Sequence, residues 1–150
     1  MKIRSATVAD LDVISEMLGE IEEYYGGENT PGDHAQIRTA LFGERPHASV
    51  LLALDDDDVV GLASYTFLWP AAGADSSLYL KELYVREHAR RRGVAAELMM
   101  ALSEAAGLAG CSRIEWTADT ENPPALAFYA AQDAERRAGK VFYRLEHNER

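Results

Sequence analysis

The chain has 150 residues, 47% of them hydrophobic, and a formal net charge of −10 at pH 7 with an isoelectric point near 4.8. This length suffices to bury one sizeable core, so we expect a single domain over residues 1–150. The acidic balance disfavours partners such as nucleic acid or an acidic membrane surface, and no apolar run is long enough to span a bilayer. The first residues carry no apolar signal region, so we expect a cytoplasmic protein.

Cysteine and histidine usage argues against disulfides and metals. The single cysteine, Cys111, excludes an internal disulfide and is expected to be a buried or half-buried thiol. The four histidines stand singly, with no spacing typical of a metal site, so we expect no bound metal. They are His34, His47, His88 and His147.

The first third of the chain reads as a strand followed by two helices. A short strand is expected at residues 2–6, and Thr7 or Asp10 can cap the helix that follows. Apolar residues at helical spacing over residues 11–21 predict that helix. A second, shorter helix is expected at residues 33–41.

The middle of the chain reads as three long strands. Two apolar runs, at residues 49–54 and 59–68, flank the acidic turn Asp55–Asp58 and predict a hairpin. After a loop rich in Ala and Gly, residues 77–85 predict a third long strand.

The last third alternates helix and strand. A helix begins at Val94 and ends near residues 107–110, and a strand is expected at residues 112–118. Pro123 and Pro124 suit the first turn of another helix, and residues 140–145 predict a last strand. This order predicts a mixed α/β fold, with an antiparallel meander in front of a parallel crossover.

The stretch between the third long strand and the next helix is basic. It contains Arg90–Arg92 followed by Gly93, directly before the helix N-terminus. Unpaired N–H groups at a helix start, together with arginines and a residue without a side chain, are typical of an anion site. A solvated basic turn is the plainer alternative. The Walker and Gly-x-Gly-x-x-Gly dinucleotide motifs are absent.

Two motifs resemble those of the GNAT superfamily of acyl-CoA-dependent N-acyltransferases. Arg90–Ala95 is similar to its Arg/Gln-x-x-Gly-x-Gly/Ala signature, and Leu83–Val85 precedes it at the family's distance. A second signature, Asn-x-x-Ala-x-x-Phe-Tyr, is matched by Asn122, Ala125, Phe128 and Tyr129. Residues 78–85 and 122–129 look most like the spermidine/spermine (diamine) group, which includes thialysine N-acetyltransferases.

The resemblance implies the GNAT fold, in which a splayed parallel strand pair holds acetyl-CoA. In such a site the loop amides would hold the diphosphate, while the backbone of Leu83 and Val85 would pair with the pantetheine arm. The residues expected to bind the cofactor are Leu83, Tyr84, Val85, Arg90, Arg91, Arg92, Gly93, Val94, Ala95, Ala96, Asn122, Ala125 and Phe128. Family members often form homodimers through the late strand, so residues 141–145 are expected to take part in a homodimer.

The resemblance also suggests roles in the transfer itself. Tyr129 would protonate the leaving thiolate, and the backbone N–H of Val85 would stabilise the oxyanion. A primary amine with a pKa of about 10.4 must lose a proton before it attacks, and Glu82 is our choice of base. Strand alternation places Glu82 and Tyr84 on one face and Lys81, Leu83 and Val85 on the other. A surface glutamate is the alternative for Glu82, and a half-buried helix aromatic is the alternative for Tyr129.

Acceptor recognition is expected from the first helix and one loop. These residues are Glu22, Glu23, Tyr24, Tyr25 and Trp69. A solvated helix face, and a packing role for Trp69, are the alternatives. The sequence thus predicts an N-acetyltransferase that uses acetyl-CoA to modify a small cationic amine such as a polyamine, a diamine or a lysine-like molecule. The alternatives are a non-catalytic acyl-CoA sensor and an enzyme that acts on protein, peptide or aminoglycoside amines.

Overall fold

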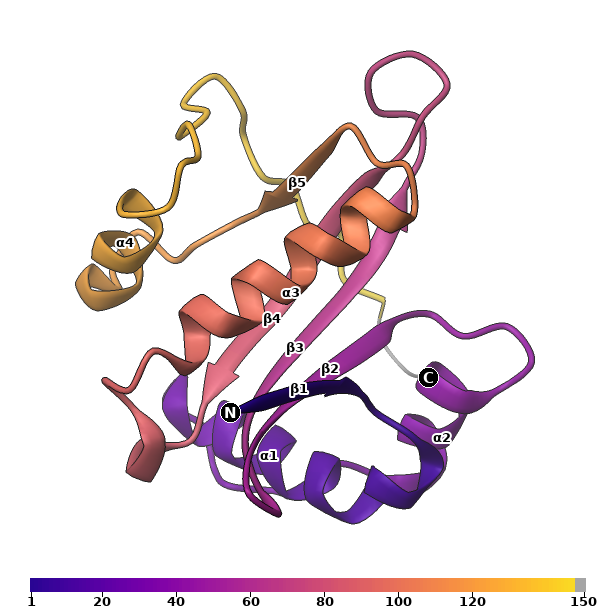
Figure 1. Ribbon diagram of the computed structural model, residues 1–150, viewed down its shortest axis with the longest axis vertical. Coiled ribbons are helices and arrows are strands. Elements are labelled where there is room, and N and C mark those ends of the chain that lie inside the picture. Colours follow the sequence, from indigo (N-terminus) through magenta and orange to yellow (C-terminus); the bar gives the residue numbers. More distant parts are fainter. Residues whose placement is uncertain (148–150) are drawn as a thin grey trace. The chain divides into compact units, whose positions relative to one another are not determined.

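The computed structural model describes residues 1–147, and these fall into two compact units. The first unit is Met1–Trp116, and the second begins at Thr117 (Figure 1). The single domain over residues 1–150 stays a prediction. Within residues 1–147 no helix has the length and apolar character that crossing a membrane requires.

The first unit is built on a five-stranded sheet with the strand order β1-β2-β3-β4-β5. Each strand up to β4 is antiparallel to the one before it, whereas β5 is parallel to β4. The strands are β1 (Lys2–Ser5), β2 (Ser49–Asp55), β3 (Asp58–Leu68), β4 (Ser77–Val85) and β5 (Arg113–Trp116). This confirms the predicted meander and parallel pair.

Helices cover both faces of this sheet (Figure 1). One face packs on α1 (Leu11–Tyr24) and α2 (His34–Phe42), with Leu52, Leu62 and Tyr84 among the sheet residues of that core. The other face carries α3 (Val94–Leu108). Two 3₁₀ turns, η1 (Val8–Asp10) and η2 (Glu87–Ala89), precede α1 and α3. Asp33 caps α2, because its side chain accepts a hydrogen bond from the Gln36 N–H at 2.9 Å.

An ion pair fastens the start of the chain to the beginning of α1. The Arg4 guanidinium donates to both carboxylate oxygens of Asp10, at 2.8 and 2.9 Å, and Asp10 is buried. The Thr7 backbone N–H donates to the same carboxylate at 2.7 Å. The hydrogen bonds from Arg4 are the main reason why the pKa of Asp10 lies below its ordinary value.

Gly61 lets α3 approach the sheet closely. A Cβ atom at this position would lie 2.8 Å from Val94 Cγ1 and 3.2 Å from Leu98 Cδ1. Gly61 pairs with Val85, the last residue of β4. The first turn of α3 therefore sits over the end of β4 because residue 61 has no side chain.

Strand β4 is longer than its parallel neighbour β5. The two pair only from Ser77 to Leu80, and Ser77 Oγ donates to Glu115 Oε1 at 2.7 Å near the start of the pair. Beyond Leu80, no strand within residues 1–147 pairs with β4 on the side of β5. We call the backbone edge of residues 81–85 on that side the open edge of β4.

Among residues 117–147 of the second unit there is one helix, α4 (Pro123–Ala130), which begins where Pro123 and Pro124 predicted. The predicted strand at residues 140–145 is wrong, because residues 140–147 adopt no regular secondary structure. A strand is stable only when its backbone groups find a partner strand, and apolar alternation does not supply one. Four side chains of this segment are largely exposed, namely Val141, Phe142, Tyr143 and Leu145.

Candidate active site

The open edge of β4 presents backbone groups of Leu83 and Val85. The Arg86 N–H donates to the Val60 carbonyl of β3 at 2.9 Å. Backbone N–H groups alternate between the two edges of a strand, so the N–H groups of Val85 and Leu83 point away from β3. These groups lie on the edge that β5 is too short to cover, and an extended ligand could add there as a strand does.

The basic loop leads from the end of β4 to α3. Gly93 has a φ of +80°, in the left-handed region that favours glycine, and nothing lies within 4 Å of the position that a Cβ would take. The Glu97 N–H makes the first helical bond, to the Gly93 carbonyl, so the preceding N–H groups have no acceptor inside the helix. Open space, unpaired N–H groups and arginines fit a phosphate, and coenzyme A carries a diphosphate.

Acidic residues of the β2–β3 turn neutralise part of the positive charge of this basic loop. Arg92 Nη1 lies 3.3 Å from Asp55 Oδ2, and His88 Nε2 lies 3.0 Å from Asp58 Oδ2. Both pairs are about half exposed. An anion that binds Arg92 would therefore compete with Asp55 for the same guanidinium.

Glu82 lies against the end of α1. The Tyr25 hydroxyl donates to Glu82 Oε2 at 3.1 Å, and the Tyr24 ring meets the Tyr84 ring edge-on at 6.4 Å. These contacts place Glu82 and Tyr84 on one face of β4, as the alternation predicted. Burial raises the pKa of Glu82, while the Tyr25 hydrogen bond and the nearby Lys81 charge oppose the rise. A half-buried carboxylate with a raised pKa is suited to accept a proton.

A second set of contacts joins α1 to β4. The Tyr84 hydroxyl donates to Glu20 Oε1 at 3.0 Å, and Arg86 Nη2 pairs with Glu20 Oε2 at 3.0 Å. Burial and the Glu20 carboxylate raise the pKa of Tyr84 to about 12, so this phenol stays protonated at neutral pH. Sequence reasoning missed Glu20 and Arg86, although Glu16, Glu20 and Glu23 share one helix face by their spacing.

These residues border an open cavity of about 660 Å³. It is lined by Glu16, Glu20, Glu23, Tyr84, Arg86, Glu87 and His88. Four carboxylates and one arginine give it an acidic character. It adjoins the strand that carries Glu82, and of the predicted acceptor residues it includes Glu23.

Other predicted acceptor residues lie at different places. Glu22 is exposed on α1. Trp69 follows β3 beyond the Leu68–Ser77 pair, at the opposite end of β4 from Val85, and it is 70% exposed. Its indole N–H donates to the Ala74 carbonyl at 2.7 Å. The structure therefore brings Tyr25 to Glu82 and Tyr24 to Tyr84, whereas Trp69 lies at the other end of β4.

The predicted residues of the second unit lie on α4. Asn122 is its N-cap, with Oδ1 accepting a hydrogen bond from the Ala125 N–H at 3.3 Å, which stabilises the start of the helix. The rings of Phe128 and Tyr129 meet edge-on with centroids 5.4 Å apart. Asn122, Ala125, Phe128 and Tyr129 are all half-buried.

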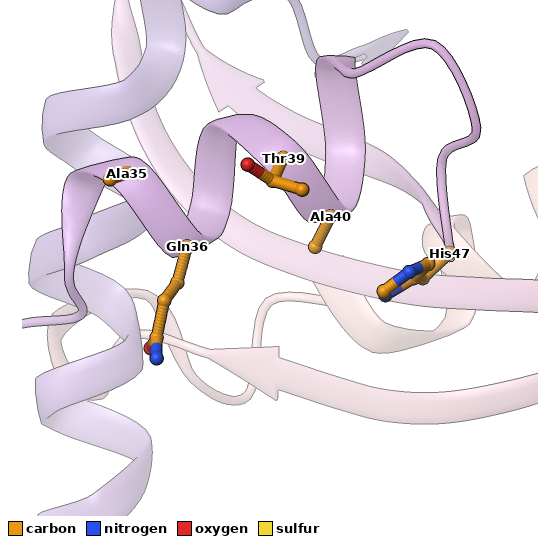
Figure 2. A pocket seen from close by; sticks show the side chains of 5 residues that line it. All are labelled: Ala35, Gln36, Thr39, Ala40 and His47. Atoms are coloured by element: carbon orange, nitrogen blue, oxygen red, sulfur yellow. The ribbon is translucent and has the colours of Figure 1, made fainter.

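A cavity at α2 contains none of the predicted site residues. It measures about 450 Å³, and Figure 2 shows its lining side chains on α2 and on the loop that follows. They are Ala35, Gln36, Thr39, Ala40 and His47. This lining has no carboxylate and no cluster of ionisable groups. Within residues 1–147 no group of three or more His, Cys, Asp or Glu side chains could hold a metal ion.

Comparisons with known proteins agree on the family. The profile described as "Acetyltransferase (GNAT) family" matches residues 14–133. The uncharacterized N-acetyltransferase YhfO of Bacillus subtilis is 27% identical over 97% of both chains. The thialysine N-epsilon-acetyltransferase of Mus musculus is 26% identical over 97% of this chain and 92% of its own. An integron cassette protein from the mobile metagenome of V. cholerae has 32% identity and a TM-score of 0.84, covering 98% of this chain and 93% of that one.

The family assignment accounts for the sheet and for both motifs predicted from the sequence. Acetyl-CoA is the general acetyl donor in this family, and the open edge of β4 and the loop before α3 fit it. With the profile covering most of its length, the chain belongs to the GNAT acetyltransferase family and is an acyl-CoA-dependent N-acetyltransferase.

Proposed function

We propose that this protein transfers the acetyl group of acetyl-CoA to a primary amine of a small cationic molecule, such as a lysine-like amine, a diamine or a polyamine. The observation that carries the proposal is the placement of Glu82, a half-buried carboxylate on β4 between the end of α1 and the open edge of the strand. The similarity to thialysine N-epsilon-acetyltransferase over nearly the whole chain supports a lysine-like acceptor.

Acetyl-CoA supplies an activated acetyl thioester when it is bound. The N–H groups at the start of α3, with Arg90 and Arg92, would hold its diphosphate. Backbone groups of Leu83 and Val85 would align its extended arm, and the Val85 N–H would donate to the carbonyl oxygen as negative charge develops there.

Glu82 would accept a proton from the substrate ammonium, directly or through water. The neutral amine can then form the new C–N bond while the C–S bond breaks, and its nitrogen releases a second proton to water, from which the acid that protonates the sulfur regains its own. The acidic cavity next to Tyr84 would favour a cationic acceptor, because its four carboxylates outnumber its arginine. The proton for the leaving sulfur is assigned to Tyr129, a role that stays a prediction from the Asn-x-x-Ala-x-x-Phe-Tyr motif.

Thiol release from acetyl-CoA tests this function directly. The purified protein should be offered thialysine, lysine, diamines, polyamines, aminoglycosides and peptides with free N-termini. We expect the highest kcat/KM among the small cationic amines. Tight coenzyme A binding without turnover on any amine would instead indicate an acyl-CoA sensor, and preference for peptides or aminoglycosides would reassign the acceptor.

Two variants test the residue roles. Glu82→Gln removes the base, and we expect kcat to fall by about 10²-fold. Glu104→Gln makes the same charge change on an exposed position of α3 and should leave kcat unchanged. Tyr129→Phe should lower kcat with little effect on coenzyme A affinity, whereas a collapse of that affinity would make Tyr129 a binding residue.

We also propose a homodimer. Its support is the exposed apolar side chains at Val141, Phe142, Tyr143 and Leu145. Light scattering coupled to size-exclusion chromatography measures the mass in solution. A mass near 16.5 kDa would contradict the dimer.

A further inference from the structure

The hydrogen bond between Tyr25 and Glu82 joins residues 57 positions apart in the chain. Tyr25 is the residue that directly follows α1, and Glu82 lies in the last part of β4. The Tyr25 hydroxyl is the donor and Glu82 Oε2 the acceptor, at 3.1 Å. The C-terminal end of α1 therefore reaches the carboxylate that we propose as the base.

Several contacts hold Tyr25 in this place. Its backbone N–H donates to the Ile21 carbonyl at 3.1 Å, so it still belongs to the last turn of α1. Its ring meets the Tyr24 ring edge-on at 5.2 Å. The next residue, Gly26, has a φ of +94°, which lets the chain turn away immediately. The Tyr84 to Glu20 hydrogen bond, one turn earlier on α1, fixes the same helix to β4.

From this arrangement we propose that Tyr25 is a positioning residue for the transfer reaction, which keeps the Glu82 carboxylate ionised and oriented toward the acceptor amine. The inference rests on the proposed function of Glu82. It gives Tyr25 a role in addition to the acceptor contact that was expected from the sequence.

The electrostatic surroundings of Glu82 make the effect measurable. Tyr25 from α1 and Lys81 from β4 are the groups that favour its charged form, and burial opposes them. The residue paired with it on β3 is Ser64, which carries no charge. Removing the Tyr25 hydroxyl takes away one of two favourable interactions, so the pKa of Glu82 must rise further.

A rise in that pKa has a defined kinetic signature. The base must be deprotonated to act, so kcat/KM falls on the acidic side of the pKa. In Tyr25→Phe the acidic limb of the plot of kcat/KM against pH should move to higher pH. We expect kcat/KM to fall by about fivefold on that limb, the value of one hydrogen bond of about 1 kcal/mol, and to approach the wild-type value at high pH.

The experiment measures kcat/KM for the best amine against pH at saturating acetyl-CoA. It compares the wild type with Tyr25→Phe, Glu82→Gln and Tyr79→Phe. Tyr79 lies near the other end of β4, where it pairs with Thr66, and it is not among the groups that shift the pKa of Glu82, so its variant controls for loss of a tyrosine hydroxyl from the sheet. Its profile should overlay the wild type. Coenzyme A affinity and Tm, measured for each variant, monitor binding and folding.

The outcomes separate the two proposals. If Glu82→Gln leaves the rate and the acidic limb unchanged, the proposed function of Glu82 fails. If Glu82→Gln abolishes the limb but Tyr25→Phe shows the wild-type profile, or loses activity equally at every pH, the role of Tyr25 fails. Should Tyr25→Phe not fold, 3-fluorotyrosine at position 25 replaces it. This stronger donor should move the limb to lower pH, and an unmoved limb would overturn the proposal.

Discussion

The guanidinium group of Arg90 lies over the ring of Tyr24, with Cζ 5.3 Å from the ring centroid. The same group lies 5.8 Å from the centroid of Tyr84, and its Nε donates to the Val85 carbonyl at 3.0 Å. One side chain of the basic loop therefore contacts the end of α1 and the last residue of β4. The proposed diphosphate site and the proposed acceptor side share this arginine.

The Tyr24 ring should support cofactor binding through Arg90. A cation–π contact at an exposed site is worth about 0.5–1 kcal/mol, so Tyr24→Leu should raise the Kd for coenzyme A by about twofold to fivefold. Tyr24→Phe keeps the ring and should bind coenzyme A as the wild type does. Isothermal titration calorimetry measures both. An equal loss in the two variants would show that the ring contact with Arg90 does not matter.

Gly61→Ala should damage both stability and cofactor binding. The new Cβ would press on Val94 and Leu98, and such overpacking costs about 1–3 kcal/mol. It would also displace the first turn of α3, so the Kd for coenzyme A should rise. Urea unfolding and calorimetry measure the two effects.

Gly107→Ala is the matched control for Gly61→Ala. Gly107 is an exposed position of α3, and nothing lies within 4 Å of the Cβ position. Alanine is the better helix former by about 1 kcal/mol, so this variant should be more stable than the wild type. If both variants lost the same stability, close packing at Gly61 would not explain the effect.

Asp55→Asn should strengthen coenzyme A binding. The change frees Arg92 from an exposed ion pair, whose strength is typically below 1 kcal/mol, so the Kd should fall by about twofold. Asp57→Asn makes the same charge change in the same turn. It therefore separates the loss of the Asp55–Arg92 ion pair from the change in net charge. The gain in coenzyme A affinity should shrink in high salt, because salt screens the interaction of Arg92 with Asp55 as well as its interaction with the diphosphate. An identical gain in both variants would assign the effect to net charge alone.

Asp10→Asn should destabilise the fold in a pH-dependent way. The pKa of Asp10 is lowered in the folded state, so its carboxylate contributes stability that is fully present above its unfolded pKa of about 3.9. That stability is lost as the pH falls through the folded pKa. At pH 7 the variant should lose about 2 kcal/mol of unfolding free energy, and the difference from the wild type should narrow below about pH 4. Urea unfolding at several pH values measures it, and a pH-independent difference would contradict the argument.

Most of the first unit could be predicted from local patterns. The strand at Ser77–Val85 and the hairpin around the acidic turn have the predicted bounds or nearly so, because apolar alternation and turn residues specify them. Helix α2 begins beside its cap Asp33, as expected. The prediction of a strand at residues 140–145 was wrong. The alternation of these residues resembles that of a strand, but a strand also needs a pairing partner, which no local pattern can supply.

The site was only partly predictable. The family motif suggested the loop from Arg90 to Ala96 and the expected chemistry suggested Glu82, and both roles stay predictions. Alternation correctly placed Glu82 and Tyr84 on one face of β4. Contacts between distant segments could not be foreseen, among them Tyr25 with Glu82 and Glu20 with Tyr84 and Arg86. Each depends on how α1 lies across β4, which follows from packing of the whole core rather than from spacing within one segment.

The open edge of β4 has a consequence for the behaviour of the protein without its cofactor. A strand edge with unpaired backbone groups is a template on which a strand of another molecule can add, and this is a common start of aggregation. A cofactor arm lying along residues 81–85 would cap that template. We therefore expect coenzyme A to protect the protein against aggregation on storage, beyond the rise in Tm that binding alone gives. Because main-chain atoms would bind the cofactor along this edge, the exposed Lys81 side chain could be replaced without loss of cofactor binding.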